Sequence, residues 1–111
     1  ADTRTLPELL IERHDILIER IGTRLKTHAT ETDIARLFIA LVEYRFMRKC
    51  PIKTFRNALH EQFKEQEIVH ERGIQKAYKN LISPLGNSKK LVKDIGEDHE
   101  AIEELKAYLS N

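Results

Sequence analysis

The sequence predicts an all-α protein, a compact bundle of five or six helices around a buried central helix at about residues 32–47. The apolar residues recur at three- and four-residue spacings, the period of a helix with one face in a core. Strand signals are scarce, since no stretch alternates apolar and polar residues for long and no Asn-Gly or Asp-Gly pair separates two β-branched runs. The 111 residues suit one core, so we expect a single helical domain over residues 1–111.

The central helix is predicted from the most apolar run of the chain, TDIARLFIALVEYRF at residues 32–46. Its apolar side chains cover one helical face and continue toward the other: Ile34, Ala35, Leu37, Phe38, Ile39, Leu41, Val42 and Phe46. A helix this apolar needs neighbours on two or three sides. Thr30 or Thr32 can cap its start, and Thr30 with Asp33 resembles a capping box. We expect the helix to end near Lys49, because the residue before Pro51 is pushed out of helical geometry.

The remaining helices are predicted around this one. The first runs from Pro7, a residue suited to a first turn, to about Lys26, and Gly22 within it marks a close helix crossing. Others are expected at about residues 52–66, 71–83 and 97–109, with a short basic helix through Ile95 that Asn87 or Ser88 can cap. Ile68 and Val69, in the connection before residue 71, should point inward. Besides the central helix, we place these residues in the core: Leu17, Ile21, Phe55, Leu59, Tyr78 and Leu81.

Composition limits the cellular setting. The single cysteine, Cys50, cannot form an internal disulfide, which fits a reducing compartment. No apolar run approaches the length of a membrane span, and no signal peptide is visible. We therefore expect a cytoplasmic protein without a membrane partner.

Signals for catalysis and for metal binding are poor. The chain has no phosphate-binding glycine loop, no Gly-x-Ser-x-Gly and no Cys-x-x-Cys. Glu67 and His70 match the Glu-x-x-His spacing of di-iron bundles, but such sites need a second copy of the pair and further carboxylates. Cys50 is more easily explained as a structural residue than as a nucleophile. We expect no enzymatic activity, no cofactor and no metal.

The charges are distributed unevenly along the chain. The formal net charge is +1, yet residues 45–64 hold six bases against one acid, and residues 72–93 hold six bases and no acid. Residues 94–111 hold six acids and one base, Lys106. The middle of the chain is therefore basic and its end is acidic, which bears on partners. The acidic helix could fold back on the basic face or simply be a soluble end.

The basic middle suggests contact with duplex DNA. The helices at 52–66 and 71–83 resemble the two helices of a helix-turn-helix unit, although their connector is longer than the usual three or four residues. The second helix would present Arg and Lys for phosphates or guanine, and Gln and Asn for adenine. The candidate DNA-contacting residues are Arg72, Gln75, Lys76, Lys79 and Asn80, with Arg48, Lys49, Lys53 and Arg56 holding the backbone. The simpler interpretation is a solvated basic face on a helical bundle.

Three segments also resemble a known family. They are DIARLFIAL in the central helix, KTFRNALHEQF in the next helix, and IQKAYKNL in the helix after it. Over about residues 31–82 the chain is similar to the RteC-type helical proteins of Bacteroidetes, which are associated with mobile conjugative elements and the regulation of their excision. The resemblance implies a DNA-associated regulator without catalytic activity, and it carries no specific functional residue across.

Two functional hypotheses follow. The first is a small, non-enzymatic, DNA-associated regulatory module with a helix-turn-helix-like basic face. The alternative is a helical protein-interaction or adaptor domain, which binds a partner helix in a groove or forms a homodimer through the apolar face of the first helix. The salt dependence of binding distinguishes the two hypotheses, because affinity from phosphate contacts falls steeply with added salt and affinity from apolar contacts does not.

Overall fold

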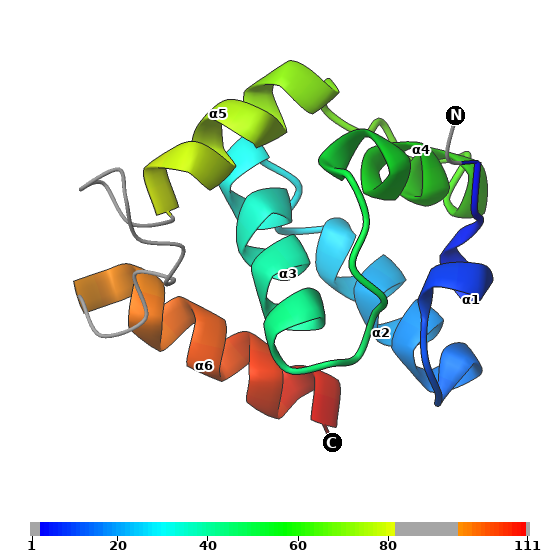
Figure 1. Ribbon diagram of the computed structural model, residues 1–111, viewed down its shortest axis with the longest axis horizontal. Helices are drawn as coiled ribbons and strands as arrows, with labels where there is room; N and C mark the ends of the chain where they lie inside the picture. Colours follow the sequence, from blue (N-terminus) through cyan, green and yellow to red (C-terminus); the bar gives the residue numbers. More distant parts are fainter. Residues whose placement is uncertain (1–2, 82–95, 111) are drawn as a thin grey trace.

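Six helices make up the part of the chain that the computed structural model describes, residues 3–81 and 96–110 (Figure 1). They are α1 Leu6–Leu9, α2 His14–Leu25, α3 Glu31–Glu43, α4 Ile52–Gln62, α5 Glu71–Leu81 and α6 Gly96–Ser110. Within these ranges the one strand-like feature is an isolated antiparallel bridge between Leu10 and Met47. The prediction of an all-α bundle is confirmed. None of the described helices combines the length and the apolar character needed to cross a membrane.

Helix α3 lies at the centre of the bundle, as predicted. It contacts both α5 and α6, which lie on opposite sides of it (Figure 1). Every residue from Ile34 to Leu41 is buried except Arg36. Its start is fixed by the capping box, in which the Asp33 N–H donates to Thr30 Oγ1 at 3.1 Å and the Thr30 N–H donates to the Asp33 carboxylate at 3.3 Å. The predicted cap is therefore confirmed.

The end of α3 differs from the prediction. The helix stops at Glu43 rather than near Lys49, and Arg45 adopts a left-handed conformation with φ of 61°. The N–H groups of Phe46 and Met47 both donate to the Leu41 carbonyl, which turns the chain back. The following backbone then pairs with the N-terminal segment, where the Arg48 N–H donates to the carbonyl of Leu9 at 2.8 Å. Met47 lies in this paired segment and is 2% exposed. The burial of its side chain offsets the helical hydrogen bonds that are lost when α3 ends early.

The first predicted helix is in fact two helices. The expected continuous run from Pro7 to Lys26 is interrupted between α1 and α2, where Arg13 has a φ of 58°. Leu10 lies in this break. It forms the β-bridge with Met47 and is 1% exposed, because its side chain belongs to the hydrophobic core. The Ile11 N–H, which would bond within a continuous helix, donates instead to the Phe46 carbonyl at 3.1 Å. The break thus exchanges helical bonds for bonds to the segment after α3.

The remaining boundaries follow the predictions more closely. Helix α4 ends at Gln62, four residues before the predicted Gln66, while α5 begins at Glu71 and α6 covers the predicted 97–109. The predicted helix at 87–95 lies outside the described residues, and so does the Leu81 side chain.

The core residues confirmed as fully buried are Leu17, Ile21, Phe55 and Leu59, whereas Tyr78 is half-buried and Ile68 is buried in the connector.

Gly22 marks a close contact, as predicted. A Cβ at this position would lie 2.8 Å from Cε1 of Phe63, the residue that follows α4. The Gly22 carbonyl also accepts a hydrogen bond from the Gln66 side chain at 3.3 Å. Glycine therefore lets the end of α4 pack directly on the α2 backbone.

The acidic helix α6 docks on α2 and α3. It buries Ile102, Leu105 and Leu109. Arg20 Nη1 donates to the Tyr108 carbonyl at 2.6 Å, and the Tyr108 hydroxyl donates back to the Arg20 carbonyl at 2.8 Å. Cations near the last carbonyls of a helix also interact favourably with its dipole. The described part of this helix therefore packs against α2 and α3, and Glu104 borders a pocket together with Arg24 of α2 and Arg36 of α3.

A second contact of α6 involves Tyr44 at the end of α3. The Tyr44 hydroxyl donates to Glu103 Oε1 at 2.7 Å, and Lys106 Nζ lies 4.6 Å from the centre of the Tyr44 ring. Partial burial, together with the hydrogen bond to the Glu103 carboxylate, raises the pKa of Tyr44 to about 12. This group is thus neutral, and remains a donor, well into the alkaline range.

Candidate nucleic-acid interface

The exposed face of α5 carries four of the residues that the sequence marked for DNA contact. Arg72, Gln75, Lys76 and Lys79 are all exposed and lie at positions i, i+3, i+4 and i+7, which align along one side of a helix. The opposite side is turned into the bundle. There Ile74 is fully buried, and the Tyr78 ring meets Phe38 of α3 edge-on, with 5.6 Å between ring centroids.

The beginning of α5 is fixed by its own cap and by a close approach to α3. His70 occupies the N-cap position, since its carbonyl accepts from the Ile74 N–H and its Nδ1 accepts from the Arg72 N–H at 3.1 Å. On the neighbouring side, a Cβ at Gly73 would overlap the Glu31 side chain at the start of α3. The absence of a side chain at Gly73 therefore brings the first turns of the two helices together.

The connector between α4 and α5, residues 63–70, is held by Arg56. Its Nε donates to the Val69 carbonyl at 3.2 Å, and its Nη2 donates to the Ile68 carbonyl at 3.1 Å. Its Nη1 also lies 3.4 Å from the Asn57 side-chain oxygen. The sequence interpretation assigned Arg56 to the DNA backbone, but in the structure this half-buried guanidinium binds the connector. Its role here is to position α5.

Arg48, Lys49 and Lys53 belong to segments other than α5. Arg48 and Lys49 are exposed but belong to the segment paired with the N-terminal residues, and the Lys49 carbonyl accepts from Arg4 at 3.4 Å. Lys53 is exposed in the first turn of α4. Asn80 belongs to α5, but its side chain lies outside the described part of the chain. The structure thus brings together four of the nine candidate residues on a single surface.

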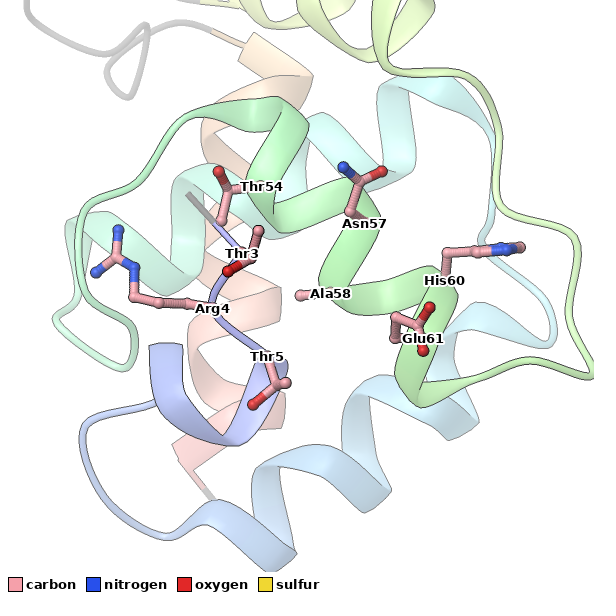
Figure 2. A pocket seen from close by; sticks show the side chains of 8 residues that line it. All are labelled: Thr3, Arg4, Thr5, Thr54, Asn57, Ala58, His60 and Glu61. Atoms are coloured by element: carbon pink, nitrogen blue, oxygen red, sulfur yellow. The ribbon is translucent and has the colours of Figure 1, made fainter. Parts of the chain in front are cut away.

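A groove that the sequence did not predict lies between the N-terminal segment and α4 (Figure 2). Its volume is about 450 Å³, and its lining residues are Thr3, Arg4, Thr5, Thr54, Asn57, Ala58, His60 and Glu61. Figure 2 shows the Arg4 side chain extending away from the middle of the groove, while the Glu61 carboxylate and the threonines border it. No sequence motif links residues 3–5 with residues 54–61, because only the folded chain brings them together. The groove lacks a convergent set of charges or nucleophiles.

Groups that could support metal or thiol chemistry are not brought together in the described ranges. Among those residues, no three His, Cys, Asp or Glu side chains gather where they could hold a metal ion. Cys50, the single cysteine of the chain, is buried beside Pro51. The α5 face is consequently the feature of the described structure with the clearest chemical character.

Comparison with known proteins identifies a family but not an activity. The whole chain, residues 1–111, matches a family of unknown function, DUF6043, and the protein belongs to it. No curated protein and no solved structure matches the chain.

Proposed function

We propose that the protein is a small, non-enzymatic regulatory module that binds duplex DNA through the exposed face of α5. The observation that supports this is the alignment of Arg72, Lys76 and Lys79 with Gln75 on one exposed stripe that contains no acidic residue. A major groove about 12 Å wide admits a helix, and seven residues of helix advance about 10 Å, so the three cations lie within two turns along such a helix. Such a stripe offers point charges to phosphates and hydrogen-bond donors to base edges.

The rigidity of α5 supports the same proposal. A recognition surface works best on an element whose position is fixed by packing and by hydrogen bonds. Three contacts restrain α5 here: the burial of Ile74, the cap from His70, and the hydrogen bonds of Arg56 to the connector. The α4–α5 arrangement differs from a standard helix-turn-helix in its eight-residue connector, residues 63–70. The resemblance of residues 31–82 to RteC-type regulators points to the same class of function.

The test is fluorescence-anisotropy binding to a random-sequence duplex at several salt concentrations. The variant K76A/K79A removes two charges from the α5 face, and K26A/K64A removes two exposed charges elsewhere as a matched control. Each lost phosphate contact should reduce the slope of log affinity against log salt by about 0.9. We expect a reduction of about 2 for K76A/K79A and little change for K26A/K64A. Equal losses in the two variants, or no salt-dependent binding by the wild type at low salt, would refute the proposal.

A second candidate function, a protein-interaction module, rests on two exposed isoleucines. Ile11 and Ile16, at the junction of α1 and α2, are 41% and 45% exposed. Leu17, Ile21 and Leu25 of α2 are buried inside the molecule and Ile18 is partly buried, so little of this apolar stripe remains for a homodimer. Sedimentation over a range of concentrations tests this function. A mass that rises with concentration, is insensitive to salt and returns to that of a monomer in Ile16→Glu would favour it.

A further inference from the structure

We propose that Arg72 is the residue with which α5 discriminates between DNA sequences, by donating two hydrogen bonds to a guanine. This inference rests on the proposed function and adds to it the residue that reads the DNA and the base that it reads. The sequence alone suggested an equal part for Gln75 and Asn80, as adenine contacts.

The orientation of α5 separates Arg72 from its neighbours. Successive residues of a helix turn by about 100°. The inward direction is given by the fully buried Ile74 and by the half-buried residues around it, which are Glu71, Gly73, Ala77 and Tyr78. Arg72 points in the opposite direction, whereas Lys76 and Lys79 lie within about 40° of it and Gln75 about 60° from it. A duplex that meets this face therefore meets Arg72 first.

The position of Arg72 along the helix supports the same role. It is the second residue of α5, and its own N–H is held by His70 Nδ1 at 3.1 Å, which fixes the backbone from which the side chain extends. In helix-turn-helix proteins, the N-terminal part of the recognition helix contacts the base edges. The lysines lie one and two turns further on, where the helix runs past the sugar-phosphate backbone.

The chemistry of the side chains distinguishes them further. A guanidinium is a planar fork whose two donors match O6 and N7 of guanine, whereas an ammonium can donate to the same atoms but has no fixed donor geometry. Arg72 is the only arginine on the exposed face of α5. Within the described part of the structure its guanidinium forms no hydrogen bond or ion pair, in contrast to the guanidinium of Arg56, which is bound to the connector. The guanidinium of Arg72 is thus available to donate to a base where α5 would approach the duplex most closely.

The experiment begins with selection of preferred duplexes from a random pool by the wild-type protein. The selected guanine is then replaced by 7-deazaguanine, which lacks the N7 acceptor. For a bidentate contact, we expect the wild type to discriminate against another base at that position by about 5- to 150-fold. Arg72→Lys keeps the charge but not the fork, so it should bind random duplex with unchanged affinity and salt slope and discriminate less. Arg72→Ala should lose the discrimination and become insensitive to 7-deazaguanine. Lys76→Arg should keep the discrimination, and Gln75→Ala should keep the guanine preference.

The outcomes distinguish this inference from the proposed function. If Arg72→Ala retains the preference of the wild type, or if the wild type tolerates 7-deazaguanine at every selected guanine, Arg72 does not read the base. The proposed function survives that result as long as K76A/K79A still loses its salt-dependent affinity. If the wild type fails to bind random duplex at low salt, both proposals fail together. Helical content and thermal unfolding of each variant, measured by circular dichroism, exclude unfolding as the cause of any loss.

Discussion

Replacing Arg56 with alanine should lower stability rather than remove a DNA contact. The guanidinium donates to the carbonyls of Ile68 and Val69, at 3.1 and 3.2 Å. A hydrogen bond to a charged group contributes about 1.5–3 kcal/mol when protected from water, and less when the group is half-exposed. Ile68 is 7% exposed, so its carbonyl is left in a poorly hydrated position when the donor is removed. We therefore expect Arg56→Ala to reduce the free energy of unfolding by about 2–3 kcal/mol.

Urea denaturation and thermal unfolding measure this loss. For a domain of this size, a change of 2–3 kcal/mol lowers the melting temperature by roughly 10 °C. Lys53→Ala is the matched control, because it removes the same charge from the same helix at an exposed position, and it should change stability by less than about 0.5 kcal/mol. Arg56→Lys should fall between the two, since an ammonium keeps the charge but cannot hold two carbonyls in the geometry of a guanidinium.

The opposite outcome has a clear meaning. If Arg56 contacts the DNA backbone, as the sequence interpretation held, Arg56→Ala should unfold like the wild type and lose affinity for every duplex. The salt slope would then fall by about 1. Unchanged stability would therefore refute the role that we assign to this side chain in holding the connector.

Three further predictions test the cap of α5, the α2–α4 contact and the docking of α6. His70→Ala should reduce the free energy of unfolding by about 1 kcal/mol in urea denaturation, while His70→Asn, which can accept the same hydrogen bond, should lose much less; equal losses would contradict the cap. Gly22→Ala should destabilise by about 1 kcal/mol, because the clash with the Phe63 ring exceeds the gain of about 0.8–1.0 kcal/mol in helix propensity, and Phe63→Leu should reverse the loss. The pKa of Tyr44 is raised from 10.0 to about 12, so its contribution to stability is complete below pH 10 and is lost as the pH rises through about 12. The stability difference between the wild type and Tyr44→Phe should accordingly shrink over that range, and a constant difference would contradict the assignment.

The sequence predicted those parts of the fold that depend on local signals. The start of α3 follows from Thr30 and Asp33, three residues apart, which satisfy each other's backbone donors. The α5 stripe could likewise be predicted, because Ile74 and Tyr78 define its buried side and leave Arg72 outside. Both features are determined within two or three turns of helix.

The features that the sequence did not predict depend on contacts between distant segments. Pro51 shows only that α3 cannot continue past it, whereas the actual end at Glu43 is set by pairing of the following segment with Leu9 and Leu10. The role of Arg56 was missed for a related reason. Its partners are backbone carbonyls in the connector, and main-chain acceptors leave no pattern in the residue types.

Several arginines of this protein hold segments of the fold together. Arg4, Arg13, Arg20 and Arg56 each donate to the backbone carbonyls of another segment, and together they join the N-terminal region, α2, α4 and α6 to their neighbours. A guanidinium suits this task because several donors on one plane can bind carbonyls that would otherwise lack partners. A count of bases therefore overstates the charge available to a ligand, since these four side chains are held by the fold. Arg72 differs from them because, within the described residues, its guanidinium is not bonded to another segment although its helix is well anchored, and this contrast is why we assign recognition to α5 rather than to the basic middle of the chain as a whole.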